Sequence, residues 1–352
     1  MAASVLACMF MVVTASVGQA GAAASRSHSS ASSAAKALTT VTFETDYLPN
    51  GKYSPFIYGV KKGYFRKEGI KLNLIYGKGS GLTIDSVATG KVDIGMVDSG
   101  VLALSVGKTH TPLKSVGLYY ARNDFAFFVP STSSVKKISQ LAGKSLIVAP
   151  GTPQAIVTPA VLKLAGISVS AVHEISISPA LADSTYAKGT GDAIGEAVNF
   201  SPIFAQTRPS RALPWVNVGY KTPGFSFAVT DNTLKTKPGL IARFLTATYR
   251  SVAASLQHPT AATSAYEREN STLSITLIKK EWTLTKPYFC TPTMVKHNNK
   301  LGYQTPGQWS KALTLLKKYS TMPASVMAKE VYTNQLFTKN KVSSSTCKKA
   351  WS

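Results

Sequence analysis

Short apolar runs alternate with helical stretches from residue 40 onward, and this alternation constrains the fold more than any other feature of the sequence. Strands are expected, in chain order, at residues 41–45, 71–76, 91–97 and 113–122. Helices are expected between them over residues 55–63, 82–89 and 101–107. A chain that repeats strand and helix in this order is typical of an α/β fold.

Two apolar segments of similar character, residues 125–130 and 225–230, lie far apart in the sequence. A second series of strands and helices begins after the first segment, and the chain becomes mainly helical after the second. The pair therefore predicts two crossovers between two lobes. We expect residues 41–129 and 224–352 to form lobe 1, and residues 130–223 to form an inserted lobe 2.

The first residues differ in composition from the rest of the chain. Residues 2–24 are apolar and uncharged and end in small residues, which is typical of a secretory signal peptide. No Lys or Arg precedes this run, so either the true start lies upstream or the signal is atypical. Residues 25–40 are rich in Ser and Ala and predict a flexible linker. These features predict an extracytoplasmic protein, located in the periplasm or at the cell surface.

Cysteine usage leaves two alternatives open. Cys8 lies in the predicted signal, and Cys290 and Cys347 remain in the mature chain. In an oxidising compartment these two residues can form a disulfide, and the alternative is two free thiols. The sequence alone does not supply the Cα separation that decides between them.

The chain is strongly basic, with 39 Lys and Arg residues against 16 Asp and Glu and a net charge of +23. Such a balance first suggests a nucleic-acid partner. The basic residues are spread along the whole chain without a known nucleic-acid motif, so we expect no nucleic-acid partner. Two explanations remain. One is attraction to an anionic cell surface, and the other is an acidic environment, where a protein that relies on few carboxylates loses little stability.

Searches for catalytic, metal and nucleotide motifs give a negative result. The five His residues are scattered, and the sequence contains no H-E-x-x-H, C-x-x-C or G-x-S-x-G pattern. The glycine-rich loop at residues 77–81, GKGSG, matches neither the P-loop nor the dinucleotide-binding spacing. We therefore predict no catalytic residue, no metal ligand and no cofactor, and we expect Lys78 to be a solvated surface charge.

Residues 53–70, YSPFIYGVKKGYFRKEGI, resemble a P-F-Y-V-A-x-x-x-G-Y-F-x-x-E-G-L segment of periplasmic solute-binding proteins. These proteins serve ABC importers for nitrate, sulfonates, taurine and pyrimidine precursors. Residues 46–50, DYLPN, resemble the D-W-x-P-N of the branch that binds thiamine-pyrimidine precursors and riboflavin. Further matches follow in the family's order at residues 79–81, 90–95, 138–144, 150–152 and 191–193.

The resemblance implies a two-lobed periplasmic-binding-protein fold of type II, with two βα lobes joined by two hinge crossovers. It also implies a small-molecule ligand in the cleft and an ABC permease in the membrane as partners. We further expect a monomer that is not an enzyme, because position 53 lacks the His of the enzyme and the chain carries an export signal. Ligands of open α/β sheets sit outside the carboxyl ends of the strands. The residues expected to bind ligand at these ends are Asp46, Tyr47, Asn50, Tyr53, Ser80, Asp98, Ser99, Thr152 and Asn199.

Three departures from the family pattern leave the ligand open. Tyr47 replaces the Trp of the precursor-binding branch, Tyr53 replaces a His, and Ser201 replaces a Glu. Tyr47 and Tyr53 can stack on a flat ring, which favours a heteroaromatic, pyrimidine-precursor-like ligand. The alternatives are an organic sulfonate, a carboxylate or another small anion. An alternative of another class is an enzyme of the same fold that resembles a pyrimidine-precursor synthase.

Overall fold

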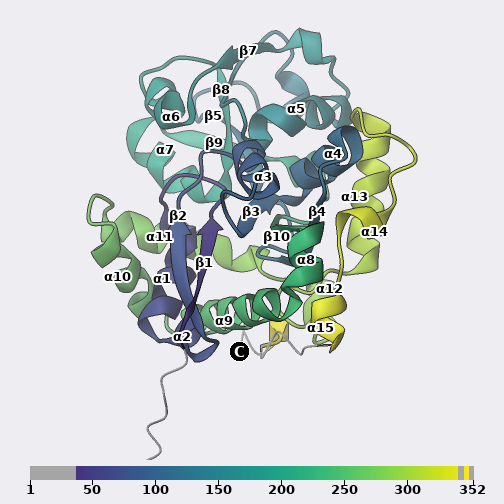
Figure 1. Cartoon of the computed structure of the whole chain (residues 1–352). Coiled ribbons are helices and arrows are strands. Elements are labelled where there is room, and N and C mark those ends of the chain that lie inside the picture. Colours follow the sequence, from purple (N-terminus) through teal and green to yellow (C-terminus); the bar gives the residue numbers. More distant parts are fainter. Residues whose placement is uncertain (1–36, 340–344, 349–352) are drawn as a thin grey trace, which may run out of the picture. The chain divides into compact units, whose positions relative to one another are not determined.

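The computed structural model describes residues 37–339 and 345–348. The predicted signal peptide and most of the predicted linker lie outside the described residues. Two mixed five-stranded sheets, each flanked by helices, build the fold (Figure 1). We call the first sheet with its helices lobe 1 and the second sheet with its helices lobe 2.

The sheet of lobe 1 has the strand order β2-β1-β3-β10-β4. Its strands are β1 (Thr39–Glu44), β2 (Ile70–Ile75), β3 (Ile94–Asp98), β4 (Leu113–Leu118) and β10 (Phe225–Thr230). β1 pairs in parallel with β2 and β3, whereas β10 runs antiparallel to β3 and β4. The connecting helices are α1 (Ser54–Lys61), α2 (Tyr64–Lys67), α3 (Ser80–Ala88) and α4 (Ser99–Thr109). Every residue of β3 is buried, as expected for a central strand covered on both faces.

The sheet of lobe 2 has the strand order β7-β6-β8-β5-β9. Its strands are β5 (Phe125–Pro130), β6 (Ser145–Val148), β7 (His173–Ser176), β8 (Ala193–Ala197) and β9 (Ser210–Pro214). The helices are α5 (Pro153–Leu164), α6 (Pro179–Ala187) and α7 (Ser201–Thr207). The apolar strand β5 pairs with β8 and β9, so it belongs to the second sheet, although the sequence-based boundary at residue 130 assigned most of it to lobe 1.

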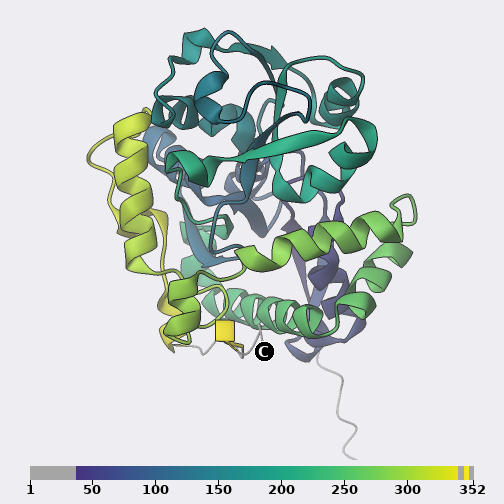
Figure 2. The ribbon, with the colours of Figure 1, turned by 180° about the vertical axis from the view of Figure 1, so that it is seen from behind.

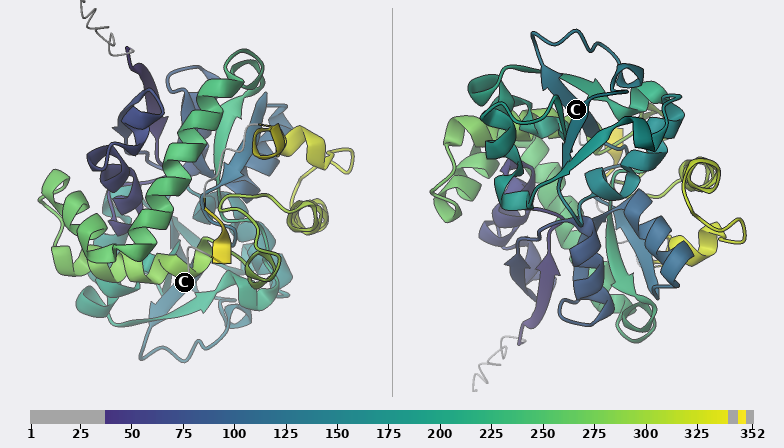
Figure 3. Two further views of the ribbon diagram at one scale, coloured as in Figure 1. Left: turned by 90° about the horizontal axis from the view of Figure 1, so that it is seen from below. Right: turned by 90° about the horizontal axis from the view of Figure 1, so that it is seen from above.

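The chain after β10 is helical, as the sequence predicts. It contains α8 (Asp231–Thr236), α9 (Pro238–Gln257), α10 (Pro259–Glu269), α11 (Ile275–Thr285), α12 (Pro292–Lys296), α13 (Pro306–Tyr319), α14 (Ala328–Val331) and α15 (Gln335–Lys339). The long helix α9 packs on α1 and α2 (Figure 3). Helices α11 and α13 reach lobe 2, where they contact α7 and α5 respectively (Figure 2). Across the described ranges, no helix has both the length and the apolar character to cross a bilayer.

Two crossovers connect the lobes, at residues 119–124 and 219–224, and they lie side by side. The backbone N–H of Asn123 donates to Thr222 O (3.2 Å), and that of Gly224 donates to Tyr120 O (3.0 Å). These two hydrogen bonds link the crossovers, an arrangement that suits a hinge between two lobes. We call residues 119–124 and 219–224 the hinge.

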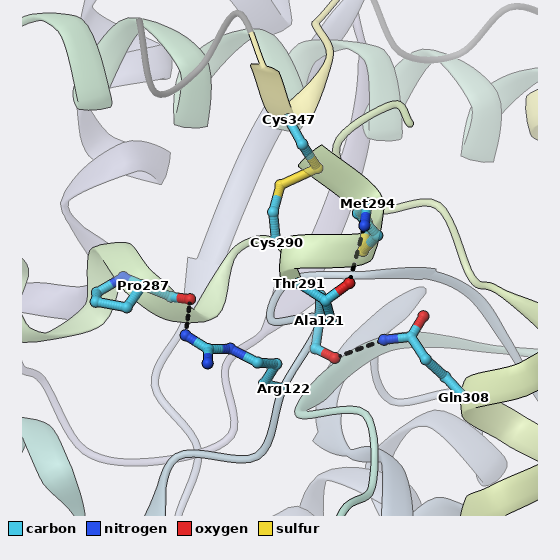
Figure 4. The surroundings of a disulfide bond; sticks show 8 residues. All are labelled: Ala121, Arg122, Pro287, Cys290, Thr291, Met294, Gln308 and Cys347. Carbon is cyan, nitrogen blue, oxygen red and sulfur yellow. Dashed lines mark hydrogen bonds between the residues drawn. A yellow bond between two sulfur atoms is a disulfide. The ribbon is translucent and has the colours of Figure 1, made fainter. Parts of the chain in front are cut away.

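A disulfide joins Cys290 to Cys347, with a Cα separation of 5.9 Å and a sequence separation of 57 (Figure 4). The segment around Cys290 also braces the hinge, since the Arg122 guanidinium donates to Pro287 O. Gln308 at the start of α13 donates through Nε2 to Ala121 O (2.8 Å). The C-terminal region therefore hydrogen-bonds to the crossover at residues 119–124.

Candidate functional site

All nine residues that the sequence singles out as ligand-binding are buried, with exposed fractions of at most 6%. They come from both lobes, and direct contacts join the two sets. Asn199 Nδ2 lies 3.4 Å from Asn50 Oδ1, and the Tyr47 hydroxyl donates to Pro179 O (3.3 Å). The Tyr47 ring also lies 6.0 Å from the ring of Phe200. We call this buried region, between the carboxyl ends of the strands of both sheets, the interlobe site.

The segment after β1 supplies a charged centre. Lys52 Nζ lies 2.8 Å from Asp46 Oδ2, and the Tyr53 hydroxyl donates to Asp46 Oδ1 (2.9 Å). Lys52 is 1% exposed, and its Nζ lies 4.3 Å from the centre of the Phe225 ring. A buried ion pair is costly unless further hydrogen bonds satisfy its atoms, and the Tyr53 hydroxyl does so for Asp46. Tyr53 thus holds Asp46 in place from within lobe 1.

Three of the predicted residues make their observed hydrogen bonds inside lobe 1. The hydroxyl of Ser80 accepts from the backbone N–H of Asp98 (2.9 Å), and Ser99 Oγ lies 2.7 Å from Ser226 Oγ. Asp98 caps α4 by accepting from Val101 N (2.9 Å). Its second oxygen lies 3.3 Å from Nδ2 of the hinge residue Asn123. Asp98 therefore couples the start of α4 to the hinge.

Lobe 2 forms the opposite wall. Thr152 caps α5, accepting from Ala155 N (3.4 Å) while it donates to Ala149 O (2.6 Å). Gln154 Nε2 donates to Glu196 Oε2 (3.2 Å). Glu196 is 3% exposed. A carboxylate held in this way is a wall residue rather than a surface charge.

Several buried acceptor atoms of this region have no hydrogen-bond partner. Both carboxylate oxygens of Asp124 are unpartnered, and this side chain is 2% exposed. Gln154 Oε1, Asn199 Oδ1 and Asp183 Oδ1 are also unpartnered. Buried polar atoms in folded proteins nearly always have a partner, so each exception requires an explanation. A ligand that donates hydrogen bonds to both lobes would satisfy them.

Burial shifts the protonation of these carboxyl groups. It raises the pKa of Asp98 and of Asp124 to about 7, and the Lys52 ammonium opposes the shift at Asp124. Burial and the neighbouring Asp183 raise the pKa of Glu196 well above its usual range. Burial also raises the pKa of Glu281, on α11, to about 7. Without a ligand, these groups hold protons that exposed carboxylates would release.

The glycine-rich loop brings the backbones of the two lobes into contact. Gly81 N donates to Gly151 O (2.8 Å). A Cβ at Gly79 would lie 2.6 Å from the same carbonyl oxygen, and Gly79 has a φ of 135°. Only glycine fits there without strain. Lys78 is exposed, which confirms its expected solvated position.

Sequence reasoning missed five residues of the region. Four are buried, namely Lys52, Asp124, Gln154 and Glu281, and the fifth is the half-buried Asp183. Two of them carried a recognisable signal. Lys52 lies in the strand-to-helix segment that already contained Asp46 and Asn50, and Asp124 immediately precedes an apolar strand. Glu281 carried none, because it comes from a distant helix and its Oε2 accepts from Gly51 N (2.5 Å).

A cavity of about 280 Å³ lies against the hinge. Its lining includes Asp124, Tyr220, Thr222 and Tyr288. The hydroxyls of Tyr220 and Thr222 have no hydrogen-bond partner. Asp124 therefore lies both at the interlobe site and at this cavity.

Two βα lobes, two paired crossovers and a buried polar site between the sheets define the class of two-lobed periplasmic-binding-protein folds. The chain belongs to the NMT1/THI5-like family, whose match covers residues 50–262. The riboflavin-binding protein RibY of Chloroflexus aurantiacus is 21% identical over 308 residues, which cover 85% of this chain and 86% of the relative.

Solved structures share the fold. The alkanesulfonate-binding protein SsuA of Xanthomonas axonopodis pv. citri, bound to MOPS, has a TM-score of 0.66 at 14% identity, covering 84% of this chain and 99% of that chain. The periplasmic nitrate-binding protein NrtA of Synechocystis PCC 6803 has a TM-score of 0.64 at 12% identity, covering 86% and 88%. At these identities the likeness concerns the fold and not the ligand.

Proposed function

We propose that this protein is the extracytoplasmic solute-binding component of an ABC importer. It binds a small heteroaromatic ligand in the interlobe site, closes by rotation about the hinge, and delivers the ligand to a membrane permease. One observation carries this proposal: acceptor atoms of Asp124, Gln154 and Asn199 lie buried and unpartnered beside the contacts that join the two lobes. A ligand bound by both lobes holds them closed.

The walls suit a flat ligand with N–H groups at its edge. Tyr47 and Phe200, one from each lobe, offer aromatic surface, and the acceptors of Gln154 and Asn199 can read ring N–H or amino groups. The RibY relative binds riboflavin, by its name, which is also a heteroaromatic compound. The enzyme alternative is tested by the fate of the bound compound, as described next.

A thermal-shift panel of pyrimidines, flavins, sulfonates, nitrate and aromatic acids tests the proposal. A ligand at one hundred times its Kd stabilises the protein by about 2.7 kcal/mol, which is readily detected. We expect one class to stabilise the wild type, and we expect the Tyr47→Ala variant to lose that shift. Mass spectrometry of the incubated compound must recover it unchanged. Conversion to a product would instead establish the enzyme, and a shift that survives Tyr47→Ala would place the ligand elsewhere.

A further inference from the structure

The charge around the interlobe site is opposite to that of the whole chain. The sequence has 39 Lys and Arg residues and only 16 Asp and Glu. Six of these carboxyl groups nevertheless gather here, where they interact electrostatically with one another or with Lys52. The six residues are Asp46, Asp98, Asp124, Asp183, Glu196 and Glu281. The basic side chain that acts on them is Lys52, so the region is acidic within a basic protein.

Lys52 neutralises only part of this charge. Its Nζ forms the salt bridge with Asp46 (2.8 Å) and packs over the Phe225 ring. Neither oxygen of Asp124 receives a hydrogen bond from Lys52 or from any other described group. A buried carboxylate without a partner is among the most unfavourable groups in a protein. Asp124 is therefore the carboxylate of the site that lacks a positively charged partner.

The unpartnered atoms that are not carboxylates lead to the same conclusion. Gln154 Oε1 and Asn199 Oδ1 are both buried, and both can only accept hydrogen bonds. The Nε2 of Gln154 already donates to Glu196, and the Nδ2 of Asn199 faces Asn50. The unpartnered hydroxyls of Tyr220 and Thr222, which line the cavity shared with Asp124, can accept as well as donate. The site thus offers hydrogen-bond acceptors from both lobes, and a ligand that satisfies them must supply hydrogen-bond donors.

We propose that the ligand of the interlobe site is a small, flat organic cation that carries several N–H donors, as amidinium, guanidinium and protonated amino-heterocycles do. The proposal rests on the proposed binding function and specifies its ligand class. The positive charge of such a ligand favours release of the protons that Asp124 and Glu196 hold in its absence, and its N–H groups donate to Gln154 and Asn199. A sulfonate or nitrate would instead add a negative charge to six carboxyl groups and supply no donor.

The net positive charge of the chain does not oppose this proposal, because it affects the association rate and not the contacts made by the bound ligand. Long-range charge governs how fast a ligand arrives, whereas contacts in the site govern how long it stays. A cation approaching a protein of net charge +23 is repelled at low salt. Its association rate constant must therefore rise with ionic strength, and that of an anion must fall.

Isothermal titration of the full chain with benzamidinium, benzamide and benzoate tests the ligand charge on one flat framework. We expect benzamidinium to bind more tightly than either of the others by on the order of tenfold, which corresponds to one favourable charge contact. The preference must disappear in Asp124→Asn and in Glu196→Gln. The matched control is Glu174→Gln, which removes an exposed carboxylate of lobe 2 and must leave the preference intact. Stopped-flow measurements must show faster benzamidinium association at higher salt.

The remaining outcomes also decide the inference, and they separate its failure from failure of the proposed function. Benzoate binding that equals or exceeds benzamidinium binding, and that Tyr47→Ala abolishes, would leave a solute-binding protein with an anion site. If none of the three probes binds, the charge of the compound that stabilises the protein in the thermal-shift panel decides whether the cation proposal holds. A neutral or anionic compound overturns the cation proposal, and a cation supports it. If no compound of either set binds, both proposals fail.

Discussion

Replacing Asp124 by Asn should stabilise the ligand-free protein while it weakens ligand binding. The carboxylate is 2% exposed, neither oxygen has a partner, and burial raises its pKa to about 7. Folding at alkaline pH therefore buries a charge that the unfolded chain keeps in water. The amide has nearly the same shape and carries no charge, so it removes this cost.

The magnitude follows from the shift in pKa. The pKa rises from 3.8 to about 7 on folding, and at pH 8 this costs roughly 4 kcal/mol at about 1.4 kcal/mol per unit. The new amide N–H groups lack partners at a cost of about 1 to 3 kcal/mol. The net stabilisation at pH 8 is then about 1 to 3 kcal/mol. At pH 5 the folded wild type holds the proton, so the gain is smaller by about 2 to 3 kcal/mol.

Urea unfolding followed by circular dichroism at pH 5 and pH 8 measures both values. Glu174→Gln serves as the control, because an exposed carboxylate should change stability by no more than about 0.5 kcal/mol. A variant that is destabilised at pH 8, or that gains equally at both pH values, would refute the reasoning. Either result would mean that Asp124 has a partner or is solvated in the ligand-free protein.

Three further predictions concern stability and closure. The wild type without ligand should be less stable at pH 8 than at pH 5. The folded pKa of Asp98 and of Asp124 exceeds the unfolded value, so the free energy of unfolding falls as pH rises from about 4 to 7. Chemical denaturation at the two pH values checks this, and the reverse order contradicts it. Gly79→Ala should weaken binding of the ligand found in the panel, because the added Cβ would lie 2.6 Å from the backbone of the facing lobe. The control is Gly307→Ala, which has open space around its Cβ and should not weaken binding. Equal affinities of the two variants would show that the close approach at Gly79 is dispensable. Cys290→Ser should lower the free energy of unfolding by up to about 4 kcal/mol in the chain-entropy model; unchanged unfolding under oxidising conditions would show that the disulfide adds no stability.

The fold could be predicted because its local patterns agree with its tertiary structure. The apolar runs near residues 41–45, 71–76 and 91–97 each became a strand of the first sheet, with ends shifted by no more than three residues. The pairing of strands is a different matter. Nothing local in the segment 125–130 determines whether it pairs with β3 or with β8, because both strands are buried along their whole length. That choice is made by contacts distant in the sequence.

The site was predicted in outline for a similar reason. Residues at the carboxyl ends of strands, such as Asp46 and Asn199, could be found because sheet geometry brings these ends together. The roles within the site could not be read in this way. Ser99 is predicted to bind ligand, and the hydrogen bond of its hydroxyl to Ser226 inside lobe 1 is not visible in any local pattern. Glu281 reaches the region through helix packing across more than two hundred residues, which no local pattern records.

The position of a bound ligand tests the central claim most directly. A crystal structure of the protein with the most strongly stabilising compound of the panel supplies it. The account predicts that the compound lies between the lobes, with its donors within hydrogen-bond distance of Asp124, Gln154 and Asn199 and with its ring against Tyr47. A compound bound in a surface groove, away from these four side chains, would contradict the account.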